Sequence, residues 1–96
     1  MVLEVITPEK KVFQGEVEAV QFPGINGSFQ VLENHAPLIS ALAPGKIKID
    51  LKNQDSKYEA FASAVESDSS NAKLIRLSVK GGVVEIRNNH IIVLAD

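Results

Sequence analysis

The chain has 96 residues, 45% of them hydrophobic and only 5% aromatic, which suffices for one domain with a modest aliphatic core. Ten basic and twelve acidic side chains give a net charge of -2, which argues against nucleic-acid binding because phosphate contacts need a clustered basic surface. No cysteine is present, so disulfides and thiolate metal sites are excluded. Without a signal-peptide pattern or an apolar run near the roughly 20 residues that span a bilayer, we expect a soluble, cytoplasmic protein.

The first half of the chain predicts strands, because hydrophobic residues recur with a period of two. Residues 2–6 alternate, and so do residues 28–32. In residues 15–22 the alternation changes phase, which predicts a β-bulge near Ala19. The stretch KIKIDLK (46–52) alternates throughout and predicts a half-buried strand with one solvated face.

The second half continues the pattern in LIRLSVK (74–80), VVEIR (83–87) and HIIVLA (90–95). Asn88 and Asn89 predict a tight turn between the last two strands, because Asn tolerates left-handed backbone angles. The Gly81-Gly82 pair predicts a sharp corner or bulge and not a phosphate-binding loop, because no helix follows it. Many short strands with closely spaced turn signals predict an all-β sandwich or barrel.

One segment, residues 56–73, departs from this pattern. Tyr58, Phe61, Ala62 and Val65 have helical spacing, yet the same residues can also extend a strand of a hairpin. We favour a long hairpin or loop excursion from Ser56 to Lys73.

The sequence contains none of the motifs that would indicate an enzyme, and two histidines without a neighbouring ligand do not predict a zinc site. His90 next to a turn is expected to be solvated. His35 could act as a general base only with a nucleophile and an orienting carboxylate, for which Ser40 and Glu33 are the nearby candidates. A small hydrolase is thus one alternative. Otherwise His35 braces its own loop or forms part of a contact surface.

An ordered series of motifs resembles a known family. The stretch ITPEKKVFQGEVEAVQFPGINGSFQVLENHAPLISALAPGKIKI (6–49) is similar, nearly end to end, to the N-terminal domain of the epsilon subunit of the F-type ATP synthase. The marks include Thr-Pro-Glu at 7–9, the glycine-containing loop from Pro23, and HAPL at 35–38. The terminal GGVVEIRNN and VLAD complete the series.

The resemblance implies a single domain over residues 1–96, folded as a ten-stranded β-sandwich of two packed, mostly antiparallel sheets. It implies a non-catalytic rotor subunit of the central stalk, which couples ion-driven rotation of the c ring to ATP synthesis. The implied partners are the gamma subunit and the c ring, with no nucleic acid, cofactor, metal or small-molecule substrate. The membrane is then contacted only indirectly, at the cytoplasmic face of a bacterial inner membrane.

The resemblance also assigns two groups of residues. The gamma interface is Thr7, His35, Pro37, Leu38 and Ser40. The loop that faces the c ring is Ile25, Asn26, Gly27 and Ser28, together with Glu33.

Two features of this sequence depart from most relatives. Many carry an acidic residue at the position of Ser28, so the resemblance implies here a neutral hydrogen bond, or Glu33 acting in its place. Most relatives also continue past Asp96 with a helical hairpin that can inhibit ATP hydrolysis. If Asp96 is the natural end, we expect the chain to lack that switch.

A free-standing β-sandwich module that binds proteins through residues 23–38 remains the alternative function. Under the rotor function, we expect Leu38, Ser40 and their neighbours to form a flat patch, not a concave pocket.

Overall fold

A computed structural model of the chain describes residues 1–52, 58–60 and 65–96. The described residues form ten strands and no helix, and nothing among them has the length and apolarity that a helical membrane crossing requires. The strands are β1 (Val2–Ile6), β2 (Lys11–Gly24), β3 (Gly27–Leu32), β4 (Leu38–Leu42), β5 (Gly45–Leu51), β6 (Tyr58–Ala60), β7 (Val65–Ser67), β8 (Leu74–Val79), β9 (Gly82–Arg87) and β10 (His90–Ala95).

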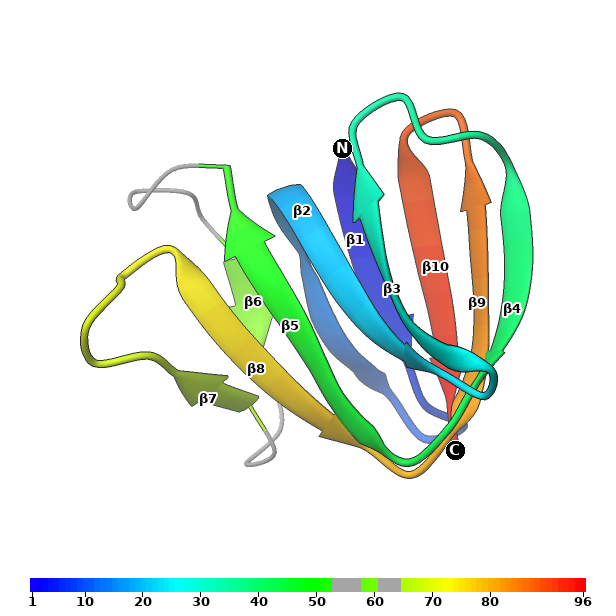
Figure 1. Cartoon of the computed structure of the whole chain (residues 1–96). Helices are drawn as coiled ribbons and strands as arrows, with labels where there is room; N and C mark the ends of the chain where they lie inside the picture. Colours follow the sequence, from blue (N-terminus) through cyan, green and yellow to red (C-terminus); the bar gives the residue numbers. More distant parts are fainter. Residues whose placement is uncertain (53–57, 61–64) are drawn as a thin grey trace.

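The strands pack in two layers that share β2, a strand of 14 residues (Figure 1). Up to Glu16, β2 pairs with β1 and β6; from Val17 onward it pairs with β5 and β3. The first layer therefore has the order β4-β9-β10-β1-β2-β6, and the second layer has the order β3-β2-β5-β8-β7. All these pairings are antiparallel except that of β1 with β10. The predicted sandwich is thus confirmed.

The core between the layers follows from the period-two pattern. In β5 the residues Ile47, Ile49 and Leu51 are buried, while Lys46 and Lys48 are exposed, as predicted. The pairing of β2 with β5 shifts register between Val17 and Ala19, which confirms the predicted bulge. This bulge lets buried side chains before and after it face the same core, although their sequence phase changes.

Two corners are built as the sequence predicts. Asn88 and Asn89 connect β9 to β10 with φ of 51° and 60°, the left-handed geometry that suits the right-handed twist of a hairpin. Gly81 and Gly82 have φ of 135° and 144° and turn the chain from β8 in one layer to β9 in the other.

The predicted excursion of residues 56–73 falls partly on residues 53–57 and 61–64, which lie outside the described residues. Of its described residues, 58–60 and 65–67 are strands, and 68–73 form bends and a turn. β6 pairs with β2, whereas β7 pairs with β8, so these two short strands join different layers.

Asp68 holds the connection between β7 and β8. Its Oδ1 accepts hydrogen bonds from the backbone N–H of Ser70 (2.8 Å), the hydroxyl of Ser70 (2.6 Å) and the N–H of Asn71 (3.1 Å). Its Oδ2 accepts a 2.9 Å hydrogen bond from the guanidinium of Arg76 on β8. The Ser70 hydroxyl and then Arg76 hold the pKa of the Asp68 carboxyl well below its ordinary value.

This lowered pKa predicts an acid-dependent hairpin. Because the folded-state pKa lies below the unfolded one, the stabilisation is complete above the unfolded pKa of about 3.9 and is lost as the pH falls toward the folded pKa. We expect Asp68→Asn to unfold at a lower temperature than wild type near neutral pH, with the difference shrinking steadily below about pH 4. Melting curves at a series of pH values measure this. Asp50→Asn on β5 is the control. If its melting temperature differed from that of wild type with the same pH dependence, the assignment of the effect to Asp68 would be contradicted.

Candidate functional site: an apolar outer face

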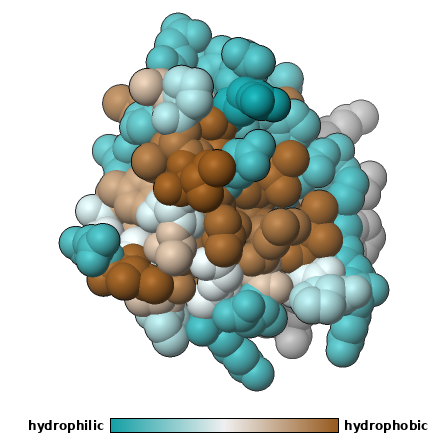
Figure 2. Space-filling model, turned by 90° about the vertical axis from the view of Figure 1, so that its right-hand side faces the viewer, coloured by the Kyte–Doolittle hydropathy of each residue, from teal (hydrophilic) through white to brown (hydrophobic). Residues whose placement is uncertain are grey.

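The outward surfaces of the two layers differ sharply in polarity. The outer side of the second layer is charged, with Lys46 and Lys48 on β5. Lys46 pairs with Glu66 at 3.2 Å, and Lys73 pairs with Glu18 at 3.2 Å. The first layer instead turns hydrophobic side chains outward, and Figure 2 shows them gathered in one patch. We call this patch the outer apolar face; it consists of Ile6, Ile39, Ala41, Val83, Ile92 and Leu94.

Strand register aligns these side chains in rows. Ile6 on β1 pairs with Leu94 on β10, Leu94 with Val83 on β9, and Val83 with Ala41 on β4. The exposed fraction is 57% for Leu94 and 43% for Val83. In the next row, Ile39 on β4 is 70% exposed. One continuous hydrophobic strip therefore crosses four strands.

Charged side chains border the strip toward the start of β10. In the row of Ile39, Glu85 lies between Ile39 and Ile92, and Glu4 lies on the other side of Ile92. In the following row Arg87 lies opposite His90. The Nε2 atom of His90 is 3.7 Å from Oε1 of Glu4. A hydrophobic centre with a charged border is typical of a surface that binds another protein. Binding removes water from the centre, whereas the border stays in contact with water.

Of the residues predicted for the gamma interface, Leu38 and Ser40 do not form the flat patch that we expected. They face inward with the buried Ile86 and Val84 of β9, and Leu38 packs against the core. Their neighbours Ile39 and Ala41 face outward instead, because successive side chains of a strand point to opposite sides. A patch exists on this strand, but Ile39 and Ala41 belong to it, and Leu38 and Ser40 do not.

His35 and Thr7 lie at opposite ends of the first layer. Thr7 follows β1 in a turn, where its hydroxyl donates to the carbonyl of Lys10 (3.1 Å). His35 lies in the loop between β3 and β4, at the end where β10 begins (Figure 1). The structure thus separates Thr7 and His35, which border the outer apolar face at its two ends and do not form one cluster. Exposed Pro37 continues this border into β4.

The hydrolase alternative is not supported by the geometry. Nδ1 of His35 bonds the carbonyl of Ala36 (2.7 Å), and the hydroxyl of Ser40 donates to the carbonyl of Ala41 (3.3 Å). Glu33 is 3.7 Å from the N-terminal ammonium of Met1. The three side chains that a catalytic triad would join are each engaged elsewhere.

The predicted ring-facing loop forms the tip of the β2–β3 hairpin. Ile25, Asn26, Gly27 and Ser28 are all exposed, with Ile25 at 62%. The backbone N–H of Ile25 donates to the carbonyl of Ala41 (3.2 Å), which joins the tip to the lower corner of the outer apolar face.

Glu33 does not lie at this tip. It follows the far end of β3, and the five residue steps from Ser28 to Glu33 span roughly 16–17 Å of extended backbone. Glu33 therefore cannot replace a carboxylate at Ser28 within one local contact, and this part of the prediction is corrected.

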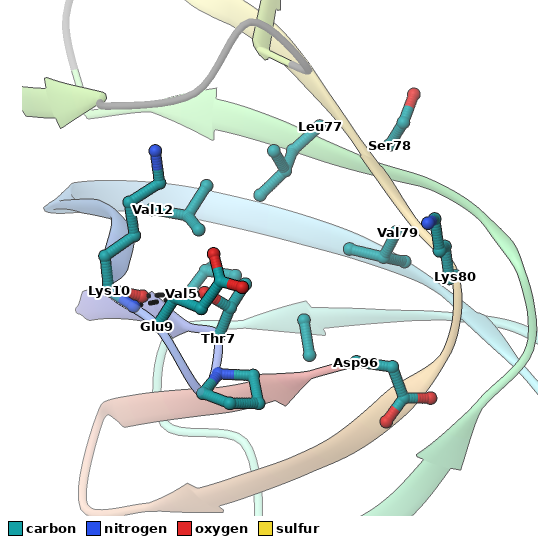
Figure 3. A pocket seen from close by; sticks show the side chains of 12 residues that line it. Val5, Thr7, Glu9, Lys10, Val12, Leu77, Ser78, Val79, Lys80 and Asp96 are labelled. Carbon is teal, nitrogen blue, oxygen red and sulfur yellow. Dashed lines mark hydrogen bonds between the residues drawn. The ribbon is translucent and has the colours of Figure 1, made fainter.

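A cavity of about 450 Å³ opens between the layers beside Thr7 (Figure 3). Its walls include buried Val5, Val12 and Leu77, and Lys10 and Asp96 are among the charged residues that line it. Its lining includes no histidine. The part of the chain that the structure describes holds no group of three or more side chains suited to a metal ion.

The residues that sequence reasoning missed are those that make the outer face apolar. The signal was present, because HIIVLA and LISAL carry hydrophobic side chains on both faces, whereas KIKIDLK alternates with charges. A strand that is apolar on both faces predicts a sheet covered on both sides. Within a free-standing domain, one of those covers is missing.

Comparison with known proteins identifies the family. A sequence model of the ATP synthase delta/epsilon chain β-sandwich domain matches residues 1–65. The chain belongs to this family. The ATP synthase epsilon chain of Chlorobaculum tepidum is 35% identical over 94 residues, an alignment that covers 98% of this chain and 86% of that relative. The epsilon chain of Leptospira interrogans is 37% identical over 94 residues, which cover 98% of this chain and 59% of the relative.

The comparison with solved structures agrees with the fold. A chain in the cryo-EM structure of the central stalk and c ring of the Tetrahymena thermophila mitochondrial ATP synthase superimposes with a TM-score of 0.64. It is 16% identical, and the match covers 99% of this chain and 62% of that one, so it supports the fold. The epsilon-type resemblance read from the motifs is confirmed. This chain spans most of some family members and little more than half of others.

Proposed function

We propose that the chain is a non-catalytic rotor subunit of an F-type ATP synthase, which links the gamma subunit to the c ring in the central stalk. The observation that carries this proposal is the outer apolar face. This chain belongs to the family, and it exposes a hydrophobic strip that crosses four strands. Such a surface lowers its free energy by binding a protein, at about 25 cal/mol for each square ångström of apolar surface removed from water.

In this proposal the outer apolar face and its border bind gamma. Ile39, Val83 and Leu94 supply the hydrophobic centre of the contact. His35 and Thr7 lie at two ends of the border and supply polar contacts that orient the partner.

The β2–β3 tip is the part that we propose meets the polar loops of the c ring. Its residues from Ile25 to Ser28 are exposed and carry no charge, so its contacts would be hydrogen bonds and one apolar side chain. Attachment to the cytoplasmic side of a bacterial membrane would then come through the ring. In this function the chain transmits torque between gamma and the ring, and no group on it takes part in chemistry.

Calorimetric titration of the chain with the gamma subunit of the same organism tests this function. We expect saturable one-to-one binding, about tenfold weaker for His35→Ala because a border contact is lost. Lys48→Ala, on the charged outer side of the second layer, is the control and should bind like wild type. A folded domain that shows no binding would contradict the rotor function and favour the free-standing binding module.

A further inference from the structure

Two loops far apart in sequence are joined by a reciprocal pair of amide hydrogen bonds. The backbone N–H of Asn34 donates to Oδ1 of Asn89 (2.6 Å), and Nδ2 of Asn89 donates to Oδ1 of Asn34 (3.1 Å). The first bond fixes which side-chain atom of Asn89 is oxygen, because a backbone N–H can only donate. The other side-chain atom of Asn89 is therefore the nitrogen Nδ2, which donates the second bond to Asn34. We call this pair the Asn34–Asn89 clasp.

Asn89 joins three segments of the chain, two of them through the clasp. Asn34 belongs to the loop that carries His35, and Asn89 belongs to the β9–β10 turn. The carbonyl of Asn89 also accepts a hydrogen bond from the N–H of Val2 (3.0 Å), so the start of β1 is tied to the same residue. Figure 1 shows these segments together at one end of the sandwich.

The backbone geometry makes both residues suited to this arrangement. Asn34 and Asn89 have φ of 65° and 60°, a left-handed conformation that Asn adopts more readily than other residues with a Cβ. Asn88 shares this conformation with φ of 51°, yet no side-chain hydrogen bond links it to any described residue. The turn therefore contains one Asn within the clasp and one outside it.

The loop that the clasp holds gives His35 a defined hydrogen-bonding character. Its N–H donates to the carbonyl of Leu32 (3.1 Å), and Nδ1 lies 2.7 Å from the carbonyl of Ala36. Because a carbonyl only accepts, the neutral ring carries its hydrogen on Nδ1, and Nε2 keeps a lone pair. Nε2 has no hydrogen-bond partner in the described part of the chain. It therefore presents an acceptor to a hydrogen-bond donor on another molecule.

We propose that Asn89 is a positioning residue for the partner contact of His35: the clasp holds the loop so that Nε2 meets a hydrogen-bond donor on gamma. This inference rests on the proposed function for its partner, but the positioning itself is a property of the free domain. Without the clasp the loop samples other conformations, and the affinity falls in proportion to the fraction that remains competent to bind.

Asn89→Gly and its neighbour Asn88→Gly form the matched test. Glycine keeps the left-handed turn in both variants, so only the loss of the clasp separates them. The nitrogen NMR signals of the His35 ring in the isolated domain report which nitrogen carries the hydrogen. We expect wild type and Asn88→Gly to show the Nδ1–H form and Asn89→Gly to show a mixture. Titration with gamma should then be about five- to tenfold weaker for Asn89→Gly and within about twofold of wild type for Asn88→Gly.

Asn34→Gly provides a second variant that keeps the backbone bond and removes only the bond from Nδ2 of Asn89. It should give an intermediate ring signal, and it allows the test if Asn89→Gly does not fold. An unchanged His35 ring signal in folded Asn89→Gly or Asn34→Gly would overturn the positioning role. If wild type shows the Nδ1–H form and the variants do not, yet no form binds gamma, the positioning stands and the proposed partner is wrong.

Discussion

Leu94→Asp is expected to reduce the affinity for gamma about 100-fold, or ~2.7 kcal/mol, and to leave the domain folded. Leu94 is 57% exposed in the free domain and lies in the row that joins Ile6, Val83 and Ala41. Binding would bury a carboxylate in the hydrophobic centre, where no cation of the chain lies opposite it in the row, and an unpaired buried charge is strongly unfavourable. In the free domain the same carboxylate remains hydrated, so unfolding should change by less than about 0.5 kcal/mol.

Leu32→Asp is the matched control for this result. Leu32 has the same side chain and a similar exposed fraction of 53%, but it lies on β3 and faces outward from the second layer. Calorimetric titration of both variants should separate them by at least about tenfold in affinity. Equal loss in the two variants would show that binding depends on the net charge of the domain and not on the outer apolar face.

Gly82→Ala is expected to cause a large loss of stability. Gly82 has φ of 144°, and a Cβ there would overlap the carbonyl oxygen of Leu94 and lie 2.9 Å from the Cα of Ala95. Both atoms belong to the backbone of β10, which pairs with β9 and cannot rotate away as a side chain would. We expect a cost of about 1–3 kcal/mol for the backbone conformation and a further cost of about 1–3 kcal/mol for the overlap.

Gly27→Ala separates these two contributions. Gly27 has φ of 123°, but no atom lies within 4 Å of an added Cβ, so only the conformational cost remains. Urea unfolding of the two variants should therefore show a smaller loss for Gly27→Ala. For Gly82→Ala the midpoint of thermal unfolding should fall by about 8 °C or more, since each kcal/mol shifts it by roughly 4–8 °C in a domain of this size. Equal losses in both variants would mean that the β9–β10 backbones separate without cost.

Local patterns in the sequence were enough to predict most strands and corners. The alternation in residues 46–52, the phase change at Ala19 and the paired Asn88-Asn89 each reflect an interaction within a few residues. Such features depend on backbone sterics and on which face of a strand is apolar, and both are written in neighbouring residues. The family resemblance added the order of the elements and the kind of partner.

The candidate site was predicted less well, because its residues meet only through pairings between distant strands. Ile39 and Leu94 are 55 positions apart, and the register of β4, β9 and β10 decides that they share one face. Ser40 was predicted for the same surface, but one step along a strand reverses the direction of the side chain. Glu33 and Ser28 are close in sequence, yet an extended strand holds them at opposite ends of β3.

The sequence by itself therefore determined the all-β class, the turn positions and the absence of catalytic motifs, because these follow from residue types and short spacings. Only the tertiary structure decided which hydrophobic side chains stay outside the core and that Asn34 bonds to Asn89. The physical reason is that strand pairing brings residues together through backbone hydrogen bonds, which every residue type other than proline can form in both directions. The pattern within one strand does not reveal which two strands will meet, so the face that a partner would cover is defined only when the layers are assembled.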